Sequence, residues 1–225
     1  MPTVKVVDVI SRTQTVLQDT TATRWPVTEL QNWLNDGYRE IVILRPDVNT
    51  ATGTYTCAAG TRQSIASQFP TALRVLDVVR NVAAGSSMRS VRGVDRRQLD
   101  DQRPAWHAET QSLNIAHYVF DPRLPKSFMT YPPATSAAQL EVLYSAVPSA
   151  HTLTEAQLIN TATTEVIRID DSYANALLDY VLYRAYTKDA DYAGNAQRAV
   201  VHYQAMQSSI GAKSAVDGAT GPGAA

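Results

Sequence analysis

The stretch Asp171–Ile210, DSYANALLDYVLYRAYTKDADYAGNAQRAVVHYQAMQSSI, carries a long helical pattern. Its first half is apolar on nearly every side, and such a helix must be covered from several directions. After an interruption at Lys188–Asp191, a second apolar stripe begins at Tyr192 and repeats at helical spacing to Ile210. The two halves predict a helical hairpin, with Asp189 as the N-cap of the second arm.

Two further helices are predicted near the start of the chain. Val4–Gln18 carries apolar residues at helical spacing, in spite of the β preference of its valines. Thr28 and Gln31 have the spacing of a capping box, and apolar positions repeat helically after them. Pro46 disfavours helical geometry at the residue before it and should end this helix.

The middle of the chain has a different pattern, because prolines and glycines divide it into short apolar runs, several of which alternate with period two as half-buried strands do. Val94–Asp101 is expected to be a short helix, Thr154–Asn160 a helical turn and Asp121–Pro125 a hairpin loop. The expected strands lie at Thr54–Thr56, Leu73–Val79, His117–Phe120, Ser127–Tyr131, Gln139–Tyr144 and Thr164–Ile169.

This order of elements predicts an α+β fold, in which the N- and C-terminal helices pack together as a helical bundle and the central part of the chain forms a small antiparallel β-rich region. The last residues are rich in glycine and alanine, so we expect an extended C-terminal tail. The predicted parts are N-terminal helices (1–46), the β-rich central region (47–169), the C-terminal helical hairpin (170–210) and a flexible tail that docks on a partner (211–225).

Composition narrows the class of protein. The chain has 225 residues, of which 44% are hydrophobic and 18% charged, as expected for a globular protein. It lacks the roughly 18 consecutive apolar residues of a membrane span, so we expect no membrane partner. Met1–Lys5 does not resemble a signal peptide, and the single cysteine, Cys57, fits synthesis in a reducing cytosol.

The titratable residues give no catalytic pattern. The four histidines have no second ligand at metal-binding spacing, so we expect no metal, no cofactor and no enzymatic activity. His117 and His202 are expected to have structural, hydrogen-bonded roles, and Cys57 to be a buried small apolar residue. Helix capping explains Asp171 better than acid–base chemistry does.

The arginines and tyrosines point to interfaces instead. Of the 20 basic residues 16 are arginine, a side chain favoured where carboxylates, phosphates or partner proteins are bound. Six of the eleven tyrosines lie between Tyr173 and Tyr203, and tyrosine is frequent at interfaces. We place a subunit interface at Tyr180, Tyr183, Arg184, Tyr186 and Tyr203, and channel or interface arginines at Arg89, Arg92, Arg96 and Arg97.

Several segments taken together resemble the head-to-tail adaptor (connector) proteins of tailed bacteriophages. The resemblance spans about residues 12–213 and depends on the order and spacing of its segments. They are Trp25–Leu30, Ile41–Asp47, Gly60–Gln63, Val78–Asn81, Val94–Asp100, Pro104–His107, Phe128–Pro133 and Asp179–Asp189.

The resemblance implies a structural virion protein of the phage neck, made in the host cytoplasm. Such proteins form a homo-oligomeric ring, commonly of twelve copies, beneath the portal, where they link the capsid vertex to the tail and continue the DNA channel. The partners implied are the portal protein, tail or nozzle proteins and, transiently, genomic DNA. The C-terminal segment with Ile210, Lys213 and Val216 would bind the portal.

Other functions stay open at this point. A tail-completion or stopper protein is hardly distinguishable by sequence from an adaptor. A binding module could contact nucleic acid through the arginines between Arg80 and Arg103, although the net charge of −1 argues against strong DNA binding. A small hydrolase would need a pocket that brings together Asp170, Asp171 or His107.

Overall fold

The computed structural model describes residues 2–192 and 194–220, with side chains as far as 215. Its described residues contain six α-helices and two small sheets, so the α+β class is confirmed. The chain divides into two compact units, which we describe separately. The helical unit comprises residues 1–48 and 148–225, and the β unit comprises residues 49–147.

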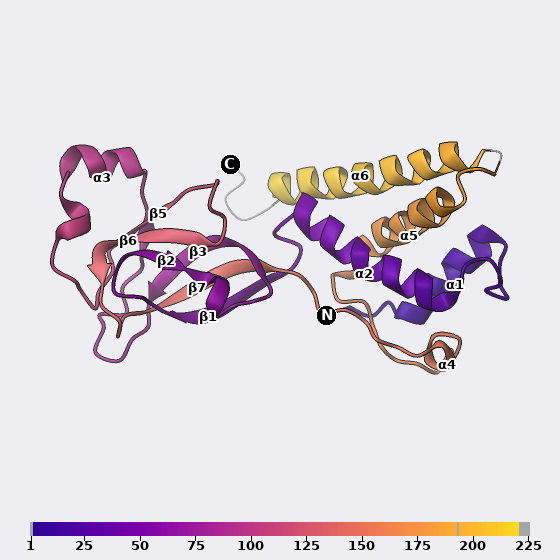
Figure 1. Ribbon diagram of the computed structural model, residues 1–225, viewed down its shortest axis with the longest axis horizontal. Helices are drawn as coiled ribbons and strands as arrows, with labels where there is room; N and C mark the ends of the chain where they lie inside the picture. The colour runs from indigo at the N-terminus through magenta and orange to yellow at the C-terminus, as the bar shows by residue number, and fades with distance from the viewer. Residues whose placement is uncertain (1, 193, 221–225) are drawn as a thin grey trace. The chain divides into compact units, whose positions relative to one another are not determined.

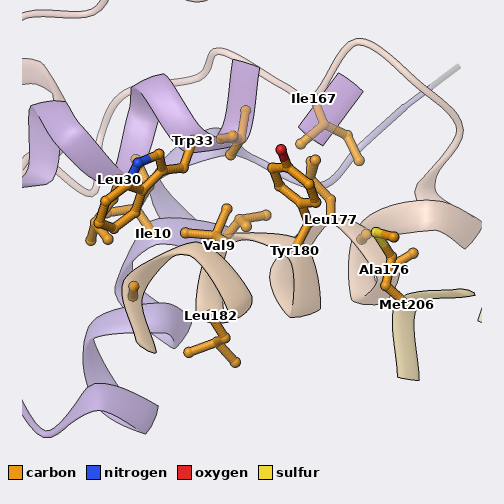
Figure 2. Packing of buried hydrophobic residues seen from close by; sticks show 14 of the residues in the cluster. Val9, Ile10, Leu30, Trp33, Ile167, Ala176, Leu177, Tyr180, Leu182 and Met206 are labelled. Carbon is orange, nitrogen blue, oxygen red and sulfur yellow. The ribbon is translucent and has the colours of Figure 1, made fainter. Parts of the chain in front are cut away.

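The helical unit has one hydrophobic core to which all its long helices contribute. Figure 2 shows side chains of this core, with Val9 and Ile10 near Leu30 and Trp33, and with Ile167 near Leu177. In Figure 1, α5 and α6 run side by side. The helices of this unit are α1 (Val6–Leu17), α2 (Val27–Leu44), α4 (Glu155–Leu158), α5 (Ala174–Lys188) and α6 (Asn195–Thr220), with a 3-10 turn at Asp171–Tyr173.

Close packing of α2 on α5 depends on a glycine in the middle of α2. A Cβ atom placed on Gly37 would lie 2.8 Å from Cδ1 of Leu177 and 3.0 Å from Cδ1 of Tyr180. Glycine within a helix costs about 1 kcal/mol relative to alanine. At this position the close approach of the two apolar helices explains why glycine is present.

Two predicted helix caps are wrong. The capping box at Thr28 does not form, because α2 begins at Val27 with Pro26 as its N-cap residue and Thr28 already lies inside the helix. Asp189 is the C-cap residue of α5 rather than the N-cap of α6. Its carboxylate accepts a hydrogen bond from the Asn195 amide at 2.7 Å and pairs with Arg24, so it joins the turn to its neighbours.

The expected strand at Thr164–Ile169 is also wrong. Only Val166 forms a bridge, with Lys5, and the backbone N–H groups of Val6 and Ile167 donate to Glu165 and Val4. A strand needs a neighbour of comparable length, and the chain next to this segment turns into α1 at Val6. Residues 148–169 belong to the helical unit.

The C-terminal tail differs from the expected extended segment, because α6 continues past Gly211 to Thr220. Met206 and Ile210 are buried in the core of the helical unit and fix the helix up to that point. Adding turns to an existing helix avoids the cost of nucleation, and the alanines that follow favour it. Residues 221–225 of the predicted tail lie outside the described residues.

The β unit contains two small sheets. One has the strand order β1-β7-β3 and the other β2-β6-β5-β4. Two apolar clusters fill this unit, a larger one around Leu140 and a smaller one around Trp106. The elements are β1 (Thr50–Thr56), β2 (Gly60–Ser64), β3 (Ala72–Asn81), β4 (Arg92–Gly93), α3 (Arg96–Gln102), β5 (His117–Phe120), β6 (Ser127–Ala134) and β7 (Gln139–Ala146), with 3-10 turns at Ile65–Ser67 and Trp106–Ala108.

Most of the predicted strands are confirmed, as are the short helix and the hairpin between β5 and β6. The region is not wholly antiparallel, however, because β4 pairs with β5 in parallel. Parallel neighbours need a long connection. Residues 94–116, which include α3, provide it.

Candidate partner-binding surfaces

The predicted interface tyrosines lie largely inside the helical unit. Tyr180 and Tyr186 are buried, and the rings of Tyr183 and Tyr203 meet at 4.9 Å between α5 and α6. The Tyr203 hydroxyl donates to Glu40 at 3.0 Å, and Arg184 donates to the Tyr180 oxygen at 3.2 Å. These side chains therefore join the helices of one chain, and only Tyr183, Arg184 and Tyr203 keep partial exposure.

Two of the three predicted portal-binding residues pack against the helical unit of their own chain. Ile210 is buried in the core, and the Lys213 ammonium lies 5.3 Å from the centre of the Tyr173 ring. Both residues hold α6 on the helical unit. Val216 lies on α6 beyond the last residue with a described side chain.

The outer face of α6 carries no charged side chain over several turns. Between Arg198 and Lys213 the helix has no acidic residue, lysine or arginine. Within this interval Val200 and Val201 are 48% and 52% exposed. Single exposed valines are ordinary. An exposed helix face of this length usually carries charges, so this one is suited to contact with another protein.

The predicted arginines lie on the surface of the β unit. Arg89, Arg92 and Arg97 are exposed, and among the residues that the structure describes none of the three has an acidic partner. Arg96 pairs with Asp100 at 3.2 Å. Arg103 and Arg80 pair with Glu109 and Glu141, so the cluster combines free and neutralised charges.

Sequence reasoning missed a buried polar network in the helical unit. The Tyr38 oxygen accepts a hydrogen bond from the backbone N–H of Arg168 at 3.1 Å and lies 2.9 Å from Nε2 of His151. Nδ1 of His151 contacts the Glu165 carboxylate, which also accepts from Arg168 at 2.9 Å. His151, Glu165 and Arg168 each lie more than 100 residues after Tyr38 in the sequence, so no local pattern could reveal the network.

This network contains the groups of an acid–base relay, but solvent and substrate cannot reach its histidine. The His151 side chain is fully buried, and burial lowers the pKa of its imidazole in spite of the nearby Glu165. Burial also raises the pKa of Tyr38 well above its usual value. A histidine that no substrate can reach, held neutral between a phenol and a carboxylate, is a structural link between α2 and the segment 151–168.

The acids proposed for a hydrolase have structural partners. Asp171 accepts hydrogen bonds from the backbone N–H groups of Thr3 and Val4 and from the Thr3 hydroxyl, which lower the pKa of its carboxyl. Asp170, rather than Asp171, caps the 3-10 turn by accepting from the Ser172 N–H at 3.0 Å. In the β unit, His107 lies 3.0 Å from the Thr61 hydroxyl.

Other predicted roles can be compared with the structure. Cys57 is buried as predicted, and burial raises the pKa of its thiol to about 12. His202 meets Asp179 at 2.9 Å, which confirms its hydrogen-bonded role. His117 lies in a strand as predicted, but the expected hydrogen bond is wrong, because its buried Nδ1 has no partner among the described residues and its ring stacks on Tyr131.

Two kinds of site are absent from the part of the chain that the structure describes. It contains no group of three or more histidine, cysteine or acidic side chains placed to hold a metal ion. None of its described helices combines the length and the hydropathy needed to cross a membrane.

The uncharged face of α6 and the exposed arginines of the β unit are surfaces suited to contact with partners. The comparison with protein families agrees, since a family of phage adaptors matches residues 4–225. The chain belongs to this family, described as SU10 adaptor protein, and the resemblance to phage head-to-tail adaptors is confirmed. No curated protein matches the chain.

Proposed function

We propose that the protein forms a closed ring of twelve copies beneath the portal, where it links the capsid vertex to the tail and continues the DNA channel. Family membership supports an adaptor role in the virion. A ring requires a heterologous interface, in which one face of each copy meets a different face of the next.

The observation that carries this proposal is the uncharged outer face of α6. Val200 and Val201 are about half exposed on it, and other apolar side chains of the helical unit are exposed elsewhere, including Ile43 at 64% on α2. A head-to-tail contact joins two different patches of one chain, and the exposed apolar side chains on α6 and on α2 offer two such patches. We assign the face of α6 to one side of this contact.

The end of the chain is assigned to the portal. Because Ile210 and Lys213 hold α6 on its own unit, the portal contact falls to the residues after Ala215, which include Val216. Tail or nozzle proteins would then meet the β unit.

Electron microscopy and native mass spectrometry, with and without the portal of the same phage, test this proposal. The full chain should form rings on the portal. A chain that ends at Ala215 should keep its fold and lose portal binding. V200D/V201D should bind portal as single copies without closing a ring, whereas the matched change Val79→Asp, at an exposed valine of the β unit, should leave rings intact. A full chain that remains monomeric with the portal would overturn the proposal.

A second candidate function is contact with nucleic acid through the exposed arginines. Arg89, Arg92 and Arg97 lack acidic partners among the described residues, and this supports weak contact with DNA as it passes. Affinity for duplex DNA should fall steeply as salt rises, and less steeply for R92A/R97A. Equal salt dependence of the two proteins would show that these arginines do not contact DNA.

A stopper protein would be distinguished from an adaptor by its position in the virion, since it would bind below an adaptor rather than on the portal.

A further inference from the structure

A pocket of about 780 Å³ opens in the β unit, where the sheet containing β2, β6 and β5 meets the start of α3. Arg62 of β2 and Val119 of β5 both lie opposite Met129 of β6 in the strand register. Residues that lie opposite one another across strands share a face of the sheet. These three side chains therefore form a row along the pocket, and Arg96 of α3 adds a second arginine.

The floor of the pocket is apolar. Val119 and Phe128 are nearly buried, and Leu124 in the hairpin between β5 and β6 is 56% exposed. Together with Met129 they are among the residues that line the pocket, although Phe128 and Met129 are neighbours in β6 and point to opposite faces of the sheet. An exposed leucine beside a pocket of this kind is placed to hold an apolar side chain of a ligand.

The rim is cationic. Arg62 is exposed and has no acidic partner among the described residues. Arg96 pairs with Asp100 of its own helix, at 3.2 Å and with 57% of its side chain exposed. An exposed pair of this kind contributes little free energy, so a ligand carboxylate can replace Asp100.

The polar wall of the pocket is fixed by hydrogen bonds of its own. The Gln63 amide donates to the carbonyl oxygens of Ala58 and Gly60 and accepts from the N–H of Ala58. Gln68 both donates to and accepts from the backbone of Thr56. Because these amide groups are satisfied, this part of the wall is preorganised, and the two arginines are the cationic groups that the lining offers to a ligand.

We propose that this pocket binds an extended acidic segment of a partner protein, with an apolar side chain on Met129 and Leu124 and a carboxylate between Arg62 and Arg96. Charge complementarity selects an acidic ligand, and the apolar floor selects a peptide over a phosphate backbone. Asp121 also lies on the rim, where it pairs with Arg123 at 3.5 Å, so the ligand carboxylate is assigned to the side of the two arginines. The inference goes beyond the proposed function, since it needs only the β unit and no ring.

Methionine methyl NMR on the full chain can test the proposal. The chain has four methionines, and Met129 is the one that lines the pocket, whereas Met206 is buried in the helical unit. The probes are blocked pentapeptides with a central leucine flanked by glutamates. Matched sets carry lysines in place of glutamates, or serine in place of leucine. The acidic leucine peptides should shift Met129 saturably, leave Met206 unchanged and bind more weakly as salt rises.

Charge reversal supplies the matched variants. R62E/R96E should weaken binding of the acidic peptide by about tenfold or more, because it removes both charge-assisted contacts and adds repulsion. R92E/R97E changes the net charge equally at arginines outside the pocket and should alter affinity by less than about twofold. Leu124→Ser should also weaken binding without disturbing the fold.

Three outcomes would overturn the proposal. One is no response of Met129 to any acidic peptide, and another is equal binding of the lysine peptides. The third is an equal Met129 shift with a single-stranded oligonucleotide, which would assign the pocket to phosphate. None of these results bears on portal binding or ring formation, so this inference and the proposed function can fail separately.

Discussion

The two units of the chain are held together in different ways. The helical unit has a single large cluster of buried apolar residues, to which α1, α2, α5 and α6 all contribute. The β unit has two smaller clusters, and side-chain amides organise its turns, with Gln63, Gln68 and Asn81 bonded to the backbone of neighbouring segments.

The difference follows from how each kind of structure satisfies its backbone. A helix satisfies most of its own N–H and C=O groups, so its packing depends chiefly on the apolar stripe. Short strands joined by irregular turns leave backbone groups that only side chains can reach. The helical unit should therefore be most sensitive to lost volume, although Gln31 and Asn35 also bond to the backbone of Leu153 and His151, and the β unit should depend more on its amides.

The largest effect is expected for Leu177→Ala in α5. Leu177 is fully buried against α2, so removing its branched end should lower the free energy of unfolding of the helical unit by about 2–5 kcal/mol. Hydrogen exchange resolved by peptide would show the loss in this unit. Leu124→Ala, at an exposed leucine, should stay within about 0.5 kcal/mol. A loss below 1 kcal/mol for Leu177→Ala would contradict the proposed reliance on packing.

In the β unit the corresponding test is Gln63→Ala. The change removes the three bonds of the buried Gln63 amide to the backbone of Ala58 and Gly60, which should cost about 1–3 kcal/mol. The matched change Gln68→Ala, at an exposed side chain with two bonds to Thr56, should cost less. Denaturant unfolding of both variants would measure the two losses in free energy of unfolding. A larger loss for Gln68→Ala than for Gln63→Ala would argue against the role of burial.

The buried network of the helical unit predicts an intermediate effect for Tyr38→Phe. The change leaves the Arg168 N–H and the His151 Nε2 without their partner, at a cost of about 1–2 kcal/mol. Tyr203→Phe, whose hydroxyl meets the partly exposed Glu40, serves as the matched control and should cost less. Equal losses from the two changes would show that the buried hydroxyl has no special role.

The same network predicts a dependence of stability on pH. Burial lowers the pKa of His151 below its usual value near 6.5, so the unfolded chain binds a proton more readily than the folded one. Stability should therefore be complete above pH 6.5 and fall as the pH drops below it. Glu165, whose pKa is lowered chiefly by its contact with His151, adds a second loss only below about 4.5.

Unfolding of the wild type and of His151→Gln between pH 8 and 5.5 would test this dependence. The wild type should lose stability across this range, and the variant should be less stable throughout but nearly independent of pH. A wild-type curve that stays flat through pH 6.5 would contradict the prediction.

The smallest effect on stability is expected for Arg96→Ala. Its exposed pair with Asp100 should contribute less than about 0.5 kcal/mol. The same change should weaken peptide binding in the pocket, so comparing unfolding with NMR titration separates a structural from a binding role for this arginine.

Local patterns predicted most of the elements. The apolar spacing of Val4–Gln18 and the proline at position 46 define the two N-terminal helices closely, because period and backbone restriction act over neighbouring residues. The predictions were wrong where a strand depends on its neighbouring segment. Thr164–Ile169 forms no strand because the adjacent chain turns into α1, and β4 pairs in parallel with β5 across a long connection.

The candidate sites were less predictable. The tyrosine-rich hairpin gave a correct position for close packing, but composition could not tell contacts within one chain from contacts between chains, because phenol groups serve both. The pocket arginines illustrate the same limit. Arg62 and Arg96 are 34 positions apart in the sequence, and strand register and the position of α3 bring them to one site.

The sequence by itself determined the α+β class, the helices at both ends and the adaptor family, since these depend on short-range periodicity and on the order of segments. The tertiary structure decided which tyrosines are buried, how burial lowers the pKa of His151 and which arginines share a pocket. These properties depend on burial and on contacts between residues distant in the chain, which no local pattern encodes.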